Sequence, residues 1–416
     1  MDVRTGLIGT GSDADPYPAY ARLREERPVC RVRLRDNAHC WVVSRYEDAR
    51  SAFADPRLSR DPRAAGPAWR EADRGRPLED GAGLGVHLLT REPPDHERLR
   101  RLVSAVFTKA RTEALRERVE QVADSLIDAF EERGEAELIA EFAYPLPITV
   151  ICEILGIPAE DRSLFRQWTS NAVATEPGDV DGRLNGVQPP GEYLRALVAA
   201  KRDAPGDDLI SALVADQGQG RLSESELLSM IFLLVIAGHE NTAGLIGNGL
   251  VALLRSPEQL ALLRERPELA DAVVEEVLRY DGPMELAAWR WTTEPVEIGG
   301  TLIPAGEPVL IALAGAHRDP ARFAEPDRFD VERPDNAHLG FGHGRHHCLG
   351  APLGRLEGAV GLRALVRRLP DLALAVPQER LRRQPSSIVR ALHELPVVFT
   401  PVRGPGGAAG PPARRR

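Results

Sequence analysis

A single cysteine between glycines marks the segment of this chain that is best suited to chemistry. The segment 341–350 reads FGHGRHHCLG and places Cys348 directly before a predicted helix over residues 351–369. A thiolate needs positive potential, which the helix N-terminus, Arg345 and the neighbouring histidines provide. The glycines allow the backbone to turn tightly and to approach a flat ligand without Cβ clashes. The pattern therefore predicts a cysteine thiolate that binds a ligand at the start of a helix.

Three interpretations of Cys348 remain open from these residues alone. Cys348 is the thiolate ligand of a haem iron, or it binds zinc together with His343, His346 and His347, or it is an inert cysteine in a glycine-rich loop. Zinc sites of this kind normally draw their ligands from two separated pairs, and donors crowded into residues 343–348 fit that geometry poorly. The segment therefore favours haem over zinc.

A polar cluster interrupts the most apolar helix that the sequence predicts. The run 231–236 is entirely apolar, residues 237–242 read AGHENT, and residues 243–246 are apolar again. Polar groups inside a buried helix cost several kcal/mol unless they are paired or hydrated, and Gly238 weakens the helix by up to about 1 kcal/mol. A helix that merely reaches the surface midway is the simpler alternative, but the renewed apolar character disfavours it. We therefore expect a break around Glu240, whose carboxylate can relay protons.

Both segments resemble the cytochrome P450 family, most closely its soluble bacterial members. The haem-ligand loop of that family, Phe-x-x-Gly-x-x-x-Cys-x-Gly, is matched by Phe341, Gly344, Cys348 and Gly350. The Ala-Gly-x-acid-Thr motif of the family is matched as far as Glu240, and the resemblance covers roughly residues 15–400. It implies haem b as cofactor, with Cys348 as the proximal iron ligand whose electron donation favours O–O cleavage.

The resemblance also implies which side chains contact the haem carboxylates. His96 and Arg100 are four residues apart and share one face of a predicted helix. Together with Arg290 and His346, they match the family's contacts to the haem propionates, and arginine suits this role through bidentate geometry.

One position departs from the family motif. The residue after Glu240 is normally Thr, but here it is Asn241, and Thr242 follows one position later. Consecutive helical residues point about 100° apart, so Thr242 need not replace the missing hydroxyl. Three explanations remain open: Asn241 orders a water molecule, the substrate lends a hydroxyl, or the enzyme carries out an atypical oxidation.

A second charged motif is expected to be structural. Glu276 and Arg279 match the family's Glu-x-x-Arg pair. With Arg328 they resemble the buried triad that fastens the meander of residues 318–337 beneath the haem. We expect this triad to support the cysteine loop.

Helical patterns precede a minor sheet along the chain. Helices are predicted over 96–107, 111–132, 143–155, 190–202, 207–214, about 224–254, and from Pro257 to Tyr280. Ser223 and Glu226 have the spacing of a capping box. Strands are predicted as a hairpin over 296–303, at 309–312, and near 371–376 and 396–400. The fold class is mainly α with a minor β sheet, the P450 fold with its long central helix over the haem.

Composition limits the cellular setting. The net charge of −9 argues against a nucleic-acid binder. The opening residues lack a secretory signal, and the apolar run 231–237 is too short to span a bilayer. We therefore expect a soluble, cytoplasmic protein without a membrane segment, formed by one domain over 1–403 and a disordered Gly/Pro/Arg tail over 404–416. The remaining cysteines, Cys30, Cys40 and Cys152, are expected to be buried and inert.

The resemblance implies a haem-dependent monooxygenase that oxidises an organic substrate with O2, such as a polyketide or peptide intermediate of specialised metabolism. Electrons would come from a separate ferredoxin and ferredoxin reductase, and Arg345, Arg355 and Arg363 could meet an acidic ferredoxin. The implied substrate pocket is lined by 82–90, a lid at 170–192, 233–240, 284–288 and 386–389. Within it Glu285 would pair with a substrate amine or face solvent. The alternatives are an atypical haem-thiolate enzyme, performing oxidative coupling or peroxide-driven oxidation, and a zinc-binding helical regulator.

Overall fold

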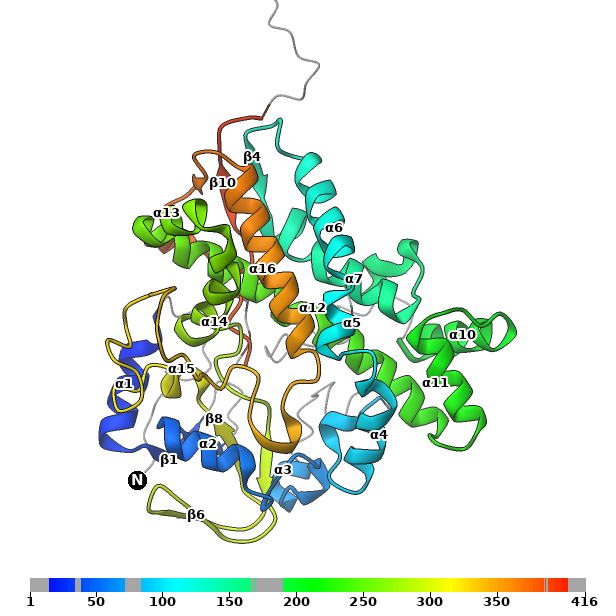
Figure 1. Cartoon of the computed structure of the whole chain (residues 1–416). Helices are drawn as coiled ribbons and strands as arrows, with labels where there is room; N and C mark the ends of the chain where they lie inside the picture. Colours follow the sequence, from blue (N-terminus) through cyan, green and yellow to red (C-terminus); the bar gives the residue numbers. More distant parts are fainter. Residues whose placement is uncertain are drawn as a thin grey trace, which may run out of the picture.

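Two long helices form the centre of the molecule (Figure 1). α12 (Glu224–Arg255) runs through the middle, and α16 (Ala351–Arg368) packs against it. A Cβ atom on Gly358 of α16 would lie 2.8 Å from Cδ2 of Leu245, so a glycine at this position allows the helices to approach closely. Although α12 is long and apolar enough to cross a membrane, most of it is buried inside the protein, as in the core helix of a globular fold.

The structure is a computed structural model that describes residues 15–33, 39–71, 84–165, 168, 190–384, 386 and 388–402. The predicted tail over 404–416 and the part of the predicted lid between 170 and 189 lie outside these residues. The division into one domain over 1–403 and a tail stays a prediction.

The remaining helices surround the central pair. Most sequence predictions are confirmed, but the stretch 111–132 is divided into α5 and α6, and the stretch after Pro257 into α13 and α14. The helices are α1 (Tyr17–Glu26), α2 (Tyr46–Ala54), α3 (Pro67–Glu71), α4 (Asp95–Ser104), α5 (Lys109–Glu113), α6 (Arg116–Asp128), α7 (Pro145–Leu155), α10 (Pro190–Asp203), α11 (Leu209–Gly218), α13 (Pro257–Glu265), α14 (Ala270–Tyr280) and α15 (Leu313–Ala316).

The predicted start of α12 is confirmed, but the predicted break in it is wrong. At the start, the N–H of Glu226 donates to the Ser223 hydroxyl at 3.2 Å, and the N–H of Ser223 donates to the Glu226 carboxylate at 2.8 Å. Residues 237–242 stay within the helix. The polar cluster does not need to break the helix because His239 and Glu240 find a hydrogen-bonding partner in Tyr144.

Within the part of the chain that the structure describes, short strands form three small sheets. The largest has the order β1 (Val29–Arg33), β2 (His39–Val43), β8 (Pro308–Ile311), β5 (Arg290–Thr292), β3 (Leu58–Ser59), in which only β2 and β8 are parallel. A second sheet joins β4 (Glu135–Glu137), β10 (Pro396–Val398) and β9 (Ala373–Leu374). The predicted hairpin is β6 (Val296–Ile298) and β7 (Thr301–Ile303), turning at Gly299 and Gly300. The prediction of a mainly α fold with a minor β component is confirmed.

Candidate active site

The segment 341–350 forms a loop that leads directly into α16. The N–H of Cys348 donates to the carbonyl of Phe341 at 2.8 Å, which closes the loop. Gly344 has a left-handed backbone with φ of 77°, and a Cβ atom there would lie 3.1 Å from the carbonyl oxygen of Phe53. Glycine is therefore required where the loop crosses the end of α2.

The environment of Cys348 differs from that of the other cysteines. Cys30, Cys40 and Cys152 are buried, as predicted, whereas the Cys348 side chain is accessible to solvent. Protein nevertheless surrounds it closely, and this desolvation raises the pKa of the thiol. The backbone N–H groups of Gly350 and Ala351 donate to its sulfur and lower the pKa, as do the positive charges of Arg100 and Arg355. The start of α16 thus supplies donors that stabilise a thiolate.

Beside this loop the structure brings together nitrogen-bearing side chains from three elements. The rings of His96 in α4 and His346 in the loop lie 4.4 Å apart between centroids. Arg290 in β5 is buried, and this burial lowers its pKa to about 9. Arg100 donates to the carbonyl of His347 at 2.9 Å and so ties α4 to the loop.

Several of these nitrogens have no hydrogen-bonding partner among the residues that the structure describes. They are both ring nitrogens of His96, Nδ1 of His346 and Nε of Arg290, and all are buried. Buried polar groups are normally satisfied, so a cluster that contains the Arg290 guanidinium and an N–H of each imidazole fits an anionic ligand with several oxygen atoms. The two carboxylates of a haem meet this requirement.

Sequence reasoning missed Glu92, whose carboxylate contacts Arg345 and His346 of the loop 341–350. Its carboxylate accepts from the backbone N–H of Arg60 at 2.7 Å and from the Arg345 guanidinium at 3.1 Å, and it lies 3.3 Å from Nε2 of His346. Desolvation raises the pKa of Glu92, but its bonds to His346 and Arg60 and the charge of Arg345 prevail and lower the pKa to about 2. The only local signal was its place before two prolines.

A pocket of about 410 Å³ opens next to Glu92. Charged side chains line it, including Asp61, Arg63 and Arg345. These walls suit water and ions better than a hydrophobic substrate.

The polar cluster of α12 forms the second part of the site. Glu240 and His239 are buried, and the hydroxyl oxygen of Tyr144 lies 2.6 Å from Nε2 of His239 and 3.2 Å from Oε1 of Glu240. Tyr144 directly precedes α7, and sequence analysis gave no reason to select it. Ala237 is exposed and Asn241 is half-buried, so these residues, one helical turn apart, form a partly open stripe on α12.

Asn241 and Thr242 have different surroundings. Oδ1 of Asn241 is buried without a hydrogen bond from any described residue. The hydroxyl of Thr242 instead faces α16, where it lies 3.6 Å from the position that a Cβ atom on Gly354 would take. Burial raises the pKa of Glu357 in α16 well above its usual value, although the neighbouring Thr242 hydroxyl acts to lower it. Thr242 therefore does not take the place of the hydroxyl expected at 241.

Two segments that the resemblance assigned to the substrate pocket, 284–288 and 386–389, lie side by side, because Met284 forms a β-bridge with Val389. A third, 82–90, meets α12 four residues before the assigned segment 233–240, where the N–H of Val86 donates to the hydroxyl of Ser229 at 3.3 Å. The carboxylate of Glu285 is buried and accepts from the Tyr20 hydroxyl at 2.8 Å, so it does not face solvent, and its pairing with a substrate amine stays a prediction.

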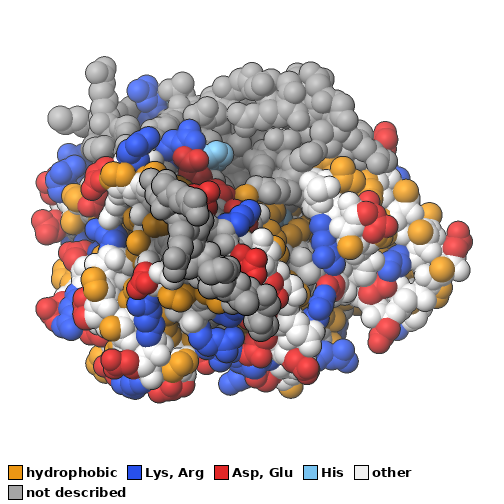
Figure 2. Space-filling model, turned by 90° about the horizontal axis from the view of Figure 1, so that it is seen from above, with side chains coloured by type: hydrophobic (Ala, Val, Ile, Leu, Met, Phe, Trp, Pro, Cys, Tyr) orange, Lys and Arg blue, Asp and Glu red, His pale blue; other side chains and the backbone are white. Residues whose placement is uncertain are grey.

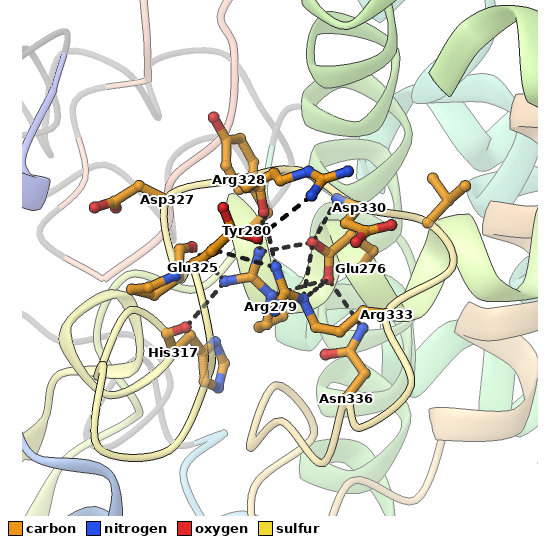
Figure 3. A network of polar contacts seen from close by, with 12 residues as sticks. Glu276, Arg279, Tyr280, His317, Glu325, Asp327, Arg328, Asp330, Arg333 and Asn336 are labelled. Carbon is orange, nitrogen blue, oxygen red and sulfur yellow. Dashed lines mark hydrogen bonds and ion pairs between the residues drawn. The ribbon is translucent and has the colours of Figure 1, made fainter. Parts of the chain in front are cut away.

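The buried charge pair is confirmed, but its third member is corrected (Figure 3). Glu276 and Arg279 are fully buried and bond at 2.6 and 2.9 Å. The third side chain is Arg333, whose Nε lies 3.2 Å from Oε2 of Glu276. Arg328 contributes only its carbonyl, which accepts from Arg279 at 2.9 Å, while its side chain is exposed beside Glu325. Arg279 also donates to the carbonyls of His317 and Pro326 and so fastens the meander to α14.

The arginines expected to meet a ferredoxin already have carboxylate partners. Arg345 pairs with Glu92, Arg355 with Glu275, and Arg363 with Glu120. On the face shown in Figure 2, acidic and basic side chains are interspersed. An acidic ferredoxin would therefore have to compete with the carboxylates that already pair with these three arginines.

Comparisons with known proteins decide the family. A model described as Cytochrome P450 matches residues 196–382. The cytochrome P450 monooxygenase PikC of Streptomyces venezuelae is 46% identical over 410 residues, which span 97% of this chain and 96% of the relative. This chain belongs to the cytochrome P450 family. It is an enzyme of the P450 monooxygenase class, with haem iron as its cofactor.

Further relatives of this P450 agree in sequence and in fold. The polyketide biosynthesis cytochrome P450 PksS of Bacillus subtilis is 38% identical over 92% of this chain and 95% of its own length. The structure of the tirandamycin C-bound P450 monooxygenase TamI has a TM-score of 0.86 at 40% identity and covers 96% of this chain and 100% of its own. These matches confirm the P450 fold.

Proposed function

We propose that this P450 contains haem b, works in the cytoplasm, and inserts one oxygen atom of O2 into an intermediate of specialised metabolism. Electrons come from a separate ferredoxin and ferredoxin reductase. One observation carries the proposal: buried nitrogens that have no partner among the described residues gather beside the exposed Cys348 at the start of α16.

The residues of the loop and α4 would hold the cofactor. Cys348 would ligate the iron, with the N–H groups at the start of α16 stabilising its thiolate. His96, Arg100, Arg290 and His346 would bind the propionates. Arg290 is suited to this because its burial leaves a cation in need of a counter-charge.

The residues of α12 would control proton supply. The bound haem supplies the oxidising chemistry, which thiolate ligation favours. Glu240 holds a proton at its carboxyl group, and the Asn241 amide, whose Oδ1 lacks a partner in the described chain, orders a water molecule. General acid catalysis of this kind contributes about 10²- to 10⁴-fold in rate.

The relatives support the substrate class. PksS is named for polyketide biosynthesis, and TamI binds tirandamycin C. The segments around Val86, Met284 and Val389, which this proposal assigns to the substrate pocket, are mainly apolar in sequence. A polyketide-type substrate of mixed polarity therefore fits this proposal.

The departure at Asn241 favours a second candidate, a haem-thiolate enzyme that performs oxidative coupling or uses peroxide. Turnover with hydrogen peroxide alone separates the two, because a monooxygenase of the proposed kind needs a reductase and O2 for full activity.

The test begins with a screen of polyketides for a substrate-induced shift of the Soret band. Turnover of the hit under ¹⁸O2 should give a product that contains one labelled atom. Glu240→Gln should lower the product formed per reducing equivalent while the spectral shift persists, since the proton is needed after substrate has bound. The matched control is Glu268→Gln, at a position that is 69% exposed. An unlabelled product, or full coupling in Glu240→Gln, would contradict the proposal.

A further inference from the structure

A buried hydrogen-bonded unit of three titratable side chains lies on α12. It consists of His239, Glu240 and Tyr144, which are 0%, 4% and 5% exposed. The Tyr144 hydroxyl bridges the other two, at 2.6 Å from Nε2 of His239 and 3.2 Å from Oε1 of Glu240. His239 and Glu240 are themselves 3.5 Å apart. The acid assigned to proton supply is thus coupled to an imidazole through one hydroxyl.

The carbonyl of Val235 fixes one proton of this unit. Nδ1 of His239 lies 2.6 Å from that oxygen. A carbonyl oxygen can only accept, so Nδ1 carries a hydrogen. When the ring is neutral, Nε2 must then be an acceptor. Tyr144 has a single hydroxyl hydrogen, and it cannot donate to both His239 and Glu240.

Two proton arrangements satisfy the three contacts that join Val235 to Nδ1, Nε2 to the Tyr144 hydroxyl, and that hydroxyl to Glu240. In the first, Glu240 is protonated and donates to Tyr144, which donates to neutral His239. In the second, doubly protonated His239 donates to Tyr144, which donates to ionised Glu240. Both arrangements hold one proton more than an ionised Glu240 beside a neutral His239. They interconvert when the Glu240 proton moves to Tyr144 and the Tyr144 proton moves to Nε2, with no other bond changed.

We propose that Tyr144 and His239 are positioning residues that keep this proton on Glu240, with the Tyr144 hydroxyl accepting from the carboxyl group and donating to Nε2 of His239. The first arrangement is the resting one, because it avoids two charges in a site from which solvent is excluded. The inference rests on the proposed function, since it presumes that Glu240 supplies protons. It adds the two residues that keep the Glu240 carboxyl group protonated.

Spectroscopy of the resting holoenzyme tests where the proton lies. In infrared spectra of protein with ¹³C-labelled glutamate, Glu240→Gln should remove one protonated-carboxyl band. The fully buried Glu357, whose pKa is raised well above its usual value, should give a second band as an internal reference. Tyr144→Phe should shift the Glu240 band, because its hydrogen bond is lost. The matched control Tyr193→Phe, which removes a tyrosine bond to Asp161 instead of one to Glu240, should not.

Nitrogen NMR of the diamagnetic ferrous carbon monoxide complex locates the histidine protons. His239, assigned by its absence in His239→Gln, should carry a hydrogen on Nδ1 and none on Nε2. An unchanged infrared spectrum in Glu240→Gln, or a doubly protonated His239, would overturn the resting assignment.

Turnover separates this inference from the proposed function. Tyr144→Phe should lower the product yield per reducing equivalent about 10-fold, less than the 10²- to 10⁴-fold that a general acid contributes. Its substrate-induced Soret shift and substrate affinity should match the wild type. Uncoupling in Glu240→Gln without uncoupling in Tyr144→Phe would overturn the inference and leave the proposed function intact. Full coupling in Glu240→Gln would instead overturn the proposed role of Glu240.

Discussion

Replacing Glu276 with alanine should lower the free energy of unfolding, because Glu276 holds the meander of residues 318–337 against α14. The Glu276 carboxylate accepts from Arg279 at 2.6 Å, from Arg333 at 3.2 Å, from the N–H of Asp330 at 2.8 Å and from Asn336 at 3.1 Å. Removing one partner of a buried ion pair costs about 3–5 kcal/mol. Two arginines lose their counter-charge here, so we expect the upper end of that range, about 5 kcal/mol.

Urea denaturation followed by circular dichroism measures this cost, with haem content as a second readout. The matched control is Glu325→Ala, which removes an exposed partner of Arg328 and should cost about 0–1 kcal/mol. Glu276→Ala should yield little stable holoprotein. If its unfolding free energy and haem content stayed within the range of Glu325→Ala, the network in Figure 3 would not hold the meander, and the reasoning would be refuted.

Three further predictions concern other parts of the site. Asn241→Ala should divert electrons into hydrogen peroxide, whereas Asn241→Thr should keep most product formation; equal peroxide release in both would refute the ordered water. Arg290→Leu should speed haem transfer to apomyoglobin about 10- to 100-fold, the equivalent of one charge-assisted bond of about 1.5–3 kcal/mol; an unchanged rate would contradict the propionate contact. Burial raises the pKa of Glu275, but bonds from His338 and Arg355 lower it from 4.5 to about 2. Its stabilisation is therefore complete above pH 4.5 and lost as the pH falls toward 2, and Glu275→Gln should flatten this limb of the stability profile.

The sequence predicted a structural feature correctly wherever one short segment contains all the residues that determine it. The capping box at Ser223, the hairpin at Gly299 and the loop before α16 each depend on neighbours in the chain, and each was predicted. The largest sheet could not be predicted in this way, because β2 pairs with β8, which places Trp41 opposite Val309. No periodicity within either strand indicates such a distant partner.

Site residues that stand in a sequence motif were predicted. Site residues that only the folded structure brings to the site were missed. Cys348 and Glu240 stand in spaced motifs, but Tyr144 directly precedes a different helix, α7, and reaches Glu240 only after α7 packs against α12. Arg333 replaced the expected Arg328 for a similar reason, since the course of the meander determines which arginine points inward. The break in α12 was wrongly predicted because the sequence does not show that Tyr144 satisfies the polar cluster.

The central claim is that Cys348 ligates the haem iron, and the spectrum of the reduced carbon monoxide complex tests it most directly. The wild-type protein should show the strongly red-shifted Soret band of thiolate ligation. Cys348→Ser should lose that band, because a serine hydroxyl does not provide the thiolate. Cys152→Ser, at a buried cysteine away from the loop, serves as the control and should retain it. A Cys348→Ser protein that kept the red-shifted band would show that another residue ligates the iron and would contradict the account.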